Sequence, residues 1–319
     1  MFTFVRTEIH LKKQGMINEF WSQFKLGLLS YGKAFTYLKE KRMYWYLPIP
    51  ALLMLLIYYI GSQISAWKAS WDPQLGCLEC SSMNDTIWFL LKMLISITLG
   101  LVLMKFAKYI VVIVLSPMFS IISQQVEKKI TGKKYPFDLQ QTIHDVKRGI
   151  RIALRNLMWE YIFFLIILLV AVLGWGEPTK SPVFYLTFLI GFFYYGFSFI
   201  DYINERRRLN IDESIVFMRN NRGLAVAIGM VYSLLILVPV DLALMLDYSD
   251  FVDKPLLVLS QSLIQFSLWL MASSAPILAI IAATLAMHEK VDLSTNVWSI
   301  SEEQKENNND MVVNSSEID

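Results

Sequence analysis

Residues 161–200 read YIFFLIILLVAVLGWGEPTKSPVFYLTFLIGFFYYGFSFI, and this stretch decides the class of fold. It holds two apolar runs, Tyr161–Trp175 and Pro182–Ile200, on either side of a turn rich in glycine and proline. A helix needs about 20 apolar residues to cross a bilayer, because each residue advances it about 1.5 Å. The first run has only 15 residues. The pair is therefore either two short spans or a helical hairpin that enters the membrane and turns back.

The same pattern extends over most of the chain and predicts an all-α integral membrane protein. Hydrophobic residues make up 55% of the 319 residues and charged residues 18%, whereas a soluble domain has about 25% charged residues. The sequence contains six apolar stretches: Tyr44–Ala66, Thr86–Leu115, Tyr161–Trp175, Pro182–Ile200, Gly223–Leu246 and Pro255–Met287. The fifth and sixth form a second pair. We expect Pro239 and Pro276 to interrupt them, because proline removes a backbone donor.

Lysine and arginine gather in alternate loops between these stretches. They are dense before the first stretch, between the second and third, and between the fourth and fifth. The other three loops contain only Lys68, Lys180 and Lys254. Positively charged loops stay on the cytoplasmic side of a membrane. The alternation therefore predicts that both termini are cytoplasmic.

Several cytoplasmic segments have the periodicity of amphipathic helices. Within residues 139–157 apolar residues recur every three or four positions. The basic residues fall on the other side: Lys147, Arg148, Arg151 and Arg155. Residues 20–38 are also predicted to be helical, and a stripe over residues 122–130 ends before Gly132, a typical helix stop. We expect these helices to lie at the membrane interface beside anionic headgroups, and a specific ligand role is the alternative.

We divide the chain into an N-terminal extension, residues 1–15, a single helical membrane domain, residues 16–290, and a polar tail, residues 291–319. The tail is predicted to be disordered because it lacks apolar surface to offset the entropy of ordering. Residues 1–15 lack an apolar core followed by a cleavage site, so they do not resemble a secretory signal. Met1 and Met16 are alternative translation starts.

Polar residues inside or beside the apolar stretches are candidates for a transport pathway, since burying a charge in lipid is costly. Asp201 follows the fourth stretch, where pairing with a nearby arginine is the simplest role. Asp241 lies inside the fifth, near the outer face if that helix spans and deeper if it turns back. Ser116 and Pro117 mark a helix break after the second stretch.

Cys77 and Cys80 lie in a loop predicted to be extracytoplasmic, where a disulfide is permitted. They form either a local disulfide or two free thiols, because the loop offers too few ligands for a metal site. The sequence has no phosphate-binding loop and no set of nucleophile, base and orienting residue. We therefore expect no cofactor, no metal and no enzymatic activity.

Three local motifs occur in a fixed order along residues 17–288. A basic turn leads into an aromatic start of the first span at Lys41–Pro48, and a proline break follows the second stretch at Leu115–Phe119. Ile200–Tyr202 precedes a basic segment that continues to Phe217–Arg219. With this order of elements the chain resembles the CysZ sulfate-transporter family, which is related to the eukaryotic etoposide-induced membrane proteins.

The resemblance implies two long transmembrane helices and two helical hairpins that penetrate only part of the bilayer. The short third and fourth stretches, and the broken fifth and sixth, would then be the hairpins. It further implies a multi-pass protein of the bacterial inner membrane, which assembles as a homo-oligomer and imports sulfate for sulfur assimilation.

The resemblance also implies an anion-binding turn before the first span, at Lys41 and Arg42. The family's turn is similar to Gly-x-Arg-Arg, whereas this chain has Glu40 in place of the glycine and Met43 in place of the second arginine. A carboxylate beside an oxyanion site opposes binding through like-charge repulsion. These departures count against sulfate specificity.

Two functions follow as hypotheses. The first is a permease or channel for a small oxyanion such as sulfate, and the second is a non-transporting scaffold or lipid-organising protein of the same fold. Basic loops suit an anion pathway, but topology alone also requires them. The nearly neutral net charge of +2 argues against nucleic acid. The expected partners are therefore the lipid bilayer, the anion and further copies of the chain.

Overall fold

The computed structural model describes residues 2–40, 42–71, 83–84, 87–88, 113–134, 139–249, 251–295 and 300–301. Within this part of the chain the structure is helical, apart from an antiparallel pair of two-residue strands, β1 (Lys133–Lys134) and β2 (Ile300–Ser301). The predicted all-α class is confirmed. Lys41, Cys77, Cys80 and most of the second apolar stretch lie outside the described residues.

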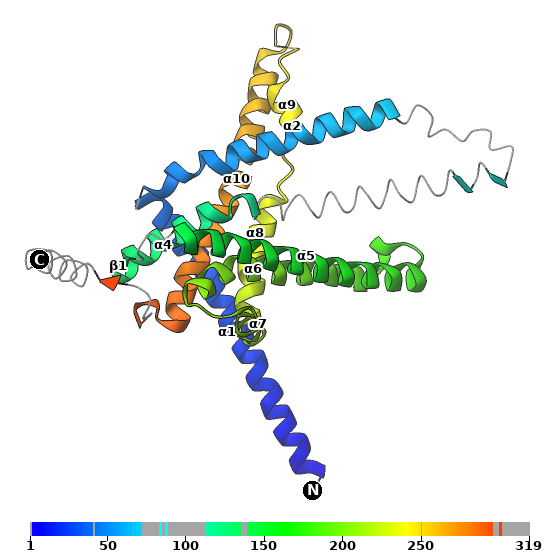
Figure 1. Cartoon of the computed structure of the whole chain (residues 1–319). Helices are drawn as coiled ribbons and strands as arrows, with labels where there is room; N and C mark the ends of the chain where they lie inside the picture. The colour runs from blue at the N-terminus through cyan, green and yellow to red at the C-terminus, as the bar shows by residue number, and fades with distance from the viewer. Residues whose placement is uncertain are drawn as a thin grey trace, which may run out of the picture.

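The α-helices are α1 (Phe2–Glu40), α2 (Pro48–Trp71), α4 (Ser116–Thr131), α5 (Leu139–Trp175), α6 (Leu186–Arg206), α7 (Ile211–Asn220), α8 (Arg222–Ile236), α9 (Leu242–Leu246) and α10 (Pro255–Val291). Short 3₁₀ helices lie between or after them: η1 (Met43–Tyr46), η2 (Pro178–Lys180), η3 (Pro182–Tyr185) and η4 (Leu293–Thr295). Figure 1 shows arms that radiate from a packed body. The body comprises α4, α6, α8, the second half of α1 and the inner half of α10.

Four described segments are long and apolar enough to cross a membrane: Met43–Gln63, Lys147–Trp175, Pro182–Arg206 and Pro255–Val291. They correspond to α2, α5, α6 and α10, and α8 is a shorter apolar helix. In Figure 1, α2 and the antiparallel pair α5–α6 extend to one side, and the outer half of α10 extends in another direction. The arrangement fits a multi-pass membrane protein whose arms present apolar side chains outward.

Helix α5 joins two segments that the sequence pattern separates. Residues 139–157 and the third apolar stretch form one helix of 37 residues, which corresponds to a length of about 55 Å. It ends only where Gly176 adopts a left-handed conformation with φ of 73°. The apolar part begins at Lys147 and spans 29 residues. The prediction of a short, separate third segment is therefore wrong, because no glycine or proline lies between Gly149 and Gly174 to end the helix.

The two prolines of the second pair behave differently from each other. Helix α8 ends at Ile236, before Pro239, as expected. Helix α10 continues through Pro276, so of the two effects expected of a proline, a kink or a break, the break is wrong. The hydroxyls of Ser273 and Ser274 donate to carbonyls of the preceding turn at 3.0 and 2.7 Å. These serines do not bond the Ala272 carbonyl, which Pro276 leaves without its backbone donor. Pro276 is buried, and packing against neighbouring helices keeps a helix intact around a proline.

The ends of α4 match the sequence prediction. The helix begins at Ser116 with Pro117 in its first turn, where a missing backbone N–H costs nothing. It closes at Gly132, whose φ is 73° and whose N–H donates to the Lys128 carbonyl at 2.9 Å. Helix α1 covers residues 20–38 as predicted and runs without a break across residues 15 and 16. The proposed domain boundaries remain predictions.

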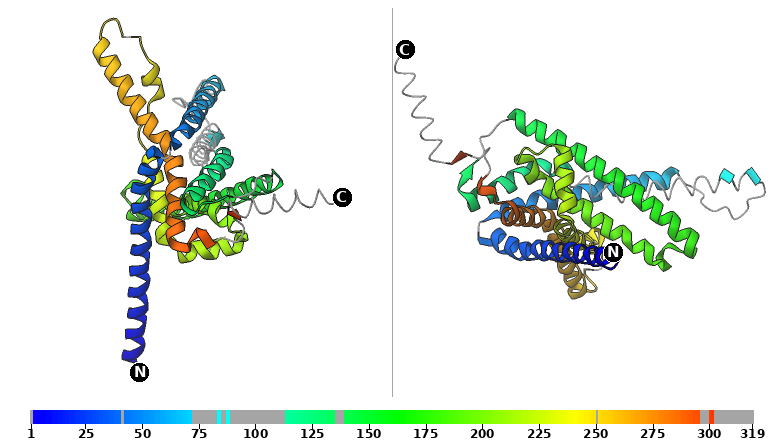
Figure 2. Two further views of the ribbon diagram at one scale, coloured as in Figure 1. Left: turned by 90° about the vertical axis from the view of Figure 1, so that its left-hand side faces the viewer. Right: turned by 90° about the horizontal axis from the view of Figure 1, so that it is seen from below.

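Close helix packing holds the body together. Helix α8 crosses α6 so tightly that a Cβ placed on Gly229 would lie 1.8 Å from the Phe192 carbonyl oxygen. The reciprocal position, Gly196, would meet the Ala225 carbonyl oxygen at the same distance. Figure 2 shows the second half of α1 running beside the inner half of α10, and α1 also packs on α8. Small residues permit this approach, which maximises van der Waals contact between apolar helices.

Substituting Gly229→Ala should therefore lower the free energy of unfolding by about 3 kcal/mol, since the added methyl must push two backbones apart. The measurement is thermal unfolding of the purified protein in one detergent. Gly174→Ala is the control, because nothing lies within 4 Å of its added Cβ. That variant should be unchanged or more stable by about 0.5–1 kcal/mol. Equal melting temperatures for both variants would contradict the tight crossing.

Candidate functional site

An ion pair buried at the end of α6 links three helices of the body. Arg206 pairs with Glu127 of α4 at 3.1 Å, and their side chains are only 5% and 1% exposed. The guanidinium also donates to the Ser123 hydroxyl at 2.6 Å. That hydroxyl lies 2.6 Å from the hydroxyl of Thr284 on α10. A buried charge is stable only with such compensation, so this cluster positions α4, α6 and α10 against one another.

A second buried cluster joins α5 to α6. Arg148 of α5 lies 3.3 Å from the Asp201 carboxylate and 3.9 Å from that of Glu205. Its guanidinium also donates to the Leu209 carbonyl, and the Ser214 hydroxyl of α7 donates to Asp201. The Arg148 and Asp201 side chains are 10% and 4% exposed. Two carboxylates and a carbonyl thus surround this arginine.

The position of Arg148 corrects the predicted basic face of residues 139–157. That face was expected to meet lipid headgroups, but Arg148 turns into the protein, while Arg151 remains exposed. The physical reason is the pair of carboxylates on α6, which need a cation once they are removed from water. Asp201 therefore has the simpler of its two expected roles, an ion pair with an arginine.

Polar contacts continue beyond the end of α6. The Asn204 amide donates to the Ser214 hydroxyl at 3.1 Å and accepts from Arg207 at 3.3 Å. The Arg207 guanidinium also lies 5.4 Å over the Phe217 ring. Burial lowers the pKa of Arg207 from its ordinary value, although an arginine stays charged at neutral pH. These contacts fasten α7 to the end of α6.

Arg155 has a different environment from the two clustered arginines. Its guanidinium donates to the Asn156 side-chain oxygen at 3.3 Å and lies 5.3 Å over the Phe197 ring. Asn156 is fully buried and donates to the Ser198 hydroxyl at 3.2 Å. Within the described residues no carboxylate lies within ion-pair distance of Arg155, although the charges of Asp201 and Asp212 act on it. Its Nε is buried without any hydrogen bond. It is therefore a partly buried cation available to an anion.

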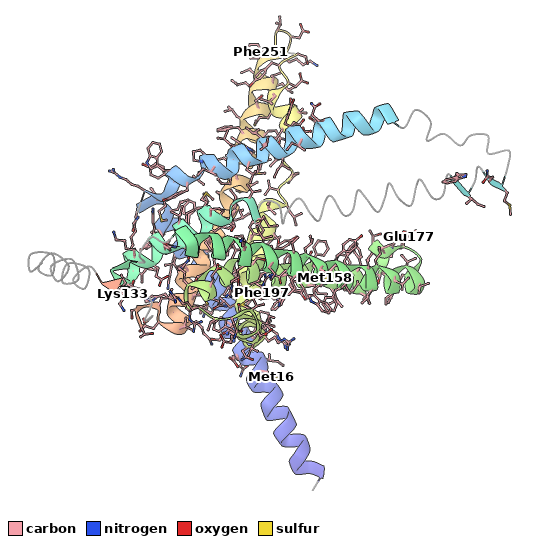
Figure 3. The ribbon with its side chains drawn as sticks, in the orientation of Figure 1. Met16, Lys133, Met158, Glu177, Phe197 and Phe251 are labelled. Carbon is pink, nitrogen blue, oxygen red and sulfur yellow. The ribbon has the colours of Figure 1, made fainter. Side chains whose placement is uncertain are left out.

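These residues belong to a polar seam between α5 and α6. We define the seam as Arg148, Arg155, Asn156 and Glu160 on α5 with Gly191, Tyr195, Ser198 and Asp201 on α6. On α5, Arg155 and Asn156 follow Arg148 by seven and eight residues, and Glu160 follows Asn156 by four. On α6 the members are three or four residues apart. Each set therefore lies on one side of its helix. Glu160 is 2% exposed, and its Oε1 lies 3.3 Å from where a Cβ on Gly191 would be. Figure 3 shows Phe197 in the body and Glu177 at the far tip of the same arm.

Ser116 lies beside the α5–α6 seam, whereas Pro117 does not face it. Ser116 is buried, and its hydroxyl is hydrogen-bonded to Tyr202, the residue after Asp201. Pro117 instead lines an apolar cavity of about 380 Å³ between α2 and α4. Two of the predicted pathway residues, Ser116 and Asp201, therefore lie near each other.

Asp241 and Arg42 lie outside the α5–α6 seam and the two buried clusters. Asp241 begins α9, where its carboxylate accepts from the Leu244 N–H at 3.0 Å, and its own N–H donates to Gln265 at 2.8 Å. This geometry assigns it a helix-capping role on an exposed surface. Arg42 is exposed after α1 and has a left-handed backbone with φ of 53°. Lys41 lies outside the described residues, so the predicted turn is seen only at Arg42.

Sequence reasoning missed Glu127, Arg206, Asn156 and Ser198 as buried polar residues. A signal for Ser198 was present in the spacing of α6, where Thr187, Gly191, Tyr195, Ser198 and Asp201 recur every three or four positions. Hydropathy averages hide such a face, because the same helix carries many aromatic residues on its other sides. Glu127 and Arg206 come from distant segments, so their pairing required the tertiary structure.

A comparison with known families identifies the chain. The family described as sulfate transporter CysZ/etoposide-induced protein 2.4 matches residues 30–246, which is more than half of the sequence. The chain belongs to this family. The match to the CysZ family covers both buried clusters except Thr284, and it ends before α10. No curated protein matches the sequence.

Breaking the buried Arg206–Glu127 pair should be far more damaging than breaking an exposed one. We expect Glu127→Gln to lower the free energy of unfolding by about 3 kcal/mol, because Arg206 stays buried without its compensating charge. Denaturant or thermal unfolding in a fixed detergent measures this difference.

The control is Glu177→Gln, which removes the partner of Lys180 from a 3.0 Å pair that is 68% and 63% exposed. Exposed ion pairs contribute about 0–1 kcal/mol to stability, so the free energy of unfolding of this variant should be close to that of the unmodified protein. A double variant, Glu127→Gln with Arg206→Met, should lose less than the sum of the single losses. Additive losses would show that the two side chains do not stabilise each other.

Proposed function

We propose that the protein is a permease or channel for a small oxyanion, with sulfate as the substrate. Family membership supports this, because the family is described by a sulfate transporter. The observation on this chain that carries the proposal is Arg155. It is a partly buried arginine inside a helix long enough to span, and it lacks a carboxylate partner among the described residues.

The surroundings of Arg155 suit an anion better than a cation. Arg148 and Arg206 already face carboxylates, so their charges are compensated within the protein. Arg155 offers a free Nε and a forked guanidinium, a geometry that matches tetrahedral oxyanions. The Ser198 hydroxyl and Asn156 amide add neutral polar groups close by. A weak, partly neutral site is what conduction needs, since an ion must also leave.

The proposed topology has two full transmembrane helices and two hairpins that enter only part of the bilayer. Helix α2 would be the first full span, and the pairs α5–α6 and α8–α10 would be the hairpins. The buried charges at the base of α5–α6 support partial entry, because they are cheaper near an interface than at mid-membrane. We further propose the bacterial inner membrane, cytoplasmic termini, a homo-oligomer, and no enzymatic activity.

Sulfate uptake into proteoliposomes tests the proposal. The purified chain should admit radiolabelled sulfate above the level of empty vesicles, and Arg155→Gln should reduce this uptake about tenfold. The loss of a charged hydrogen bond to the anion is the reason. Arg151→Gln is the matched control, because Arg151 is exposed on the same helix and should leave uptake unchanged. Absence of uptake by the folded, unmodified chain would remove the transport function.

The turn before η1 permits a separate test at Arg42. A left-handed backbone costs a non-glycine residue about 1 kcal/mol, so Arg42→Gly should keep or raise the melting temperature. The same change removes the guanidinium that the family resemblance assigns to anion binding. We therefore expect lower sulfate uptake in a protein of equal or greater stability. Unchanged uptake would show that Arg42 takes no part in transport.

The alternative is a scaffold or lipid-organising protein of the same fold. The observation that favours it is that Arg148 and Arg206 are paired with carboxylates of the protein, so that both buried clusters stabilise the body without a bound anion. Cross-linking in native membranes separates the two functions. A scaffold should yield other membrane proteins, whereas a transporter oligomer should yield mainly copies of itself.

A further inference from the structure

A second site lies where α1 meets the junction of α7 and α8. An open cavity of about 760 Å³ occupies this position. Its lining residues are Met16, Ile17, Glu19, Phe20, Trp21, Gln23, Arg219, Asn220 and Arg222. Figure 3 shows Met16 at the point where α1 leaves the body. The cavity shares no lining residue with the α5–α6 seam.

The floor of the cavity is rigid. The Gln23 amide donates to the Asn220 carbonyl at 2.9 Å, and its oxygen accepts from the Gly223 N–H at 3.2 Å. A Cβ on Gly223 would lie 2.2 Å from the Phe20 carbonyl oxygen, so α1 rests directly on α8. The cavity walls are therefore held in place by packed backbone.

The charge of the cavity is positive. Arg219 and Arg222 line it, and within the described residues neither guanidinium makes an ion pair. The Nε of Arg222 donates only to the Arg219 carbonyl at 2.9 Å. Among the described residues of the lining, Glu19 is the one carboxylate, and it accepts a hydrogen bond from the Gln23 amide at 3.1 Å. One more negative charge would balance the site.

An exposed apolar stripe starts at the same cavity. Trp21 is 59% exposed and Ile17 46% exposed. Phe24, Leu28 and Phe35 continue the stripe at helical spacing along α1. The face of α1 that adjoins this stripe, with Ser30, Tyr31 and Ala34 among its buried residues, packs on the body. Helix α1 thus has a second apolar face that no described part of the chain covers.

We propose that this cavity binds the phosphate of an anionic phospholipid, with an acyl chain lying along Ile17 and Trp21. The two arginines supply charge complementary to a phosphodiester, and the apolar stripe supplies the surface for a chain. Inorganic phosphate would use only the first feature. A second copy of this chain would bring its own arginines to the cavity and add repulsion. The lipid site does not rest on the proposed transport function, although the charge of Arg219 acts on Arg155.

Native mass spectrometry of the full-length protein, titrated with phosphatidylglycerol or phosphatidylcholine, tests the site. Phosphatidylglycerol should bind more tightly, and the double variant Arg219→Gln/Arg222→Gln should weaken that binding about 30-fold. Phosphatidylcholine binding should change little. Lys25→Gln is the matched control, because Lys25 is exposed on α1 but does not line the cavity. An equal loss for both lipids, or none for either, would overturn the proposal.

A variant that is expected to strengthen lipid binding shows that the losses in the arginine variant do not come from misfolding. Glu19→Gln removes the opposing carboxylate and should strengthen phosphatidylglycerol binding about fivefold. Inorganic phosphate at millimolar concentration should not displace the lipid, and displacement would assign the cavity to free phosphate instead. A change of oligomeric state in the double arginine variant, with lipid binding intact, would assign the surface to a second copy of the chain.

Discussion

The burial of charge at the end of α6 is the constraint on which the rest of this structure depends. Asp201, Glu205 and Arg206 lie in the last two turns of α6, and each is removed from water. Every helix that surrounds them contributes a compensating group: Arg148 from α5, Glu127 from α4 and Ser214 from α7. An isolated buried charge is prohibitively unfavourable, so these partners determine how the helices are placed. The apolar arms extend from this base, where the buried ion pairs fix the positions of the helices.

The body combines this ionic base with close apolar packing. Gly196 and Gly229 bring α6 and α8 into backbone contact, and Tyr232 packs edge-on against Phe199 at a ring distance of 4.8 Å. Hydrophobic burial provides most of the attraction in such a core, but it is not directional. The ion pairs depend on geometry, so they determine how the helices are oriented against one another. Together they explain how helices with apolar surfaces on several sides adopt one arrangement.

The helices themselves could be predicted from hydropathy, charge and the stops at Gly132 and Gly176. Two helix boundaries were predicted wrongly from the sequence. Helix α5 joins an amphipathic pattern to an apolar one, and a change of pattern was mistaken for a helix end. Helix α10 continues through the buried Pro276, where tertiary packing supports the turn. At the candidate site, Asp201 and Ser116 were recognisable as polar residues beside apolar runs. Their partners Arg148 and Tyr202 were not, since a basic residue near a membrane fits lipid headgroups equally well.

The unbroken length of α5 makes it a mechanical lever. Arg148 at its base and Trp175 at its tip are separated by about 40 Å of continuous helix. A tilt of about 5° at the base would therefore move the tip by about 3–4 Å. Arg155 and Asn156 lie near the fulcrum, where the same tilt changes distances by less than 1 Å, about the tolerance of a hydrogen bond. Such a tilt would leave the hydrogen bond between Arg155 and Asn156 unchanged, because both lie on α5, and would shift Arg155 relative to the Phe197 ring of α6.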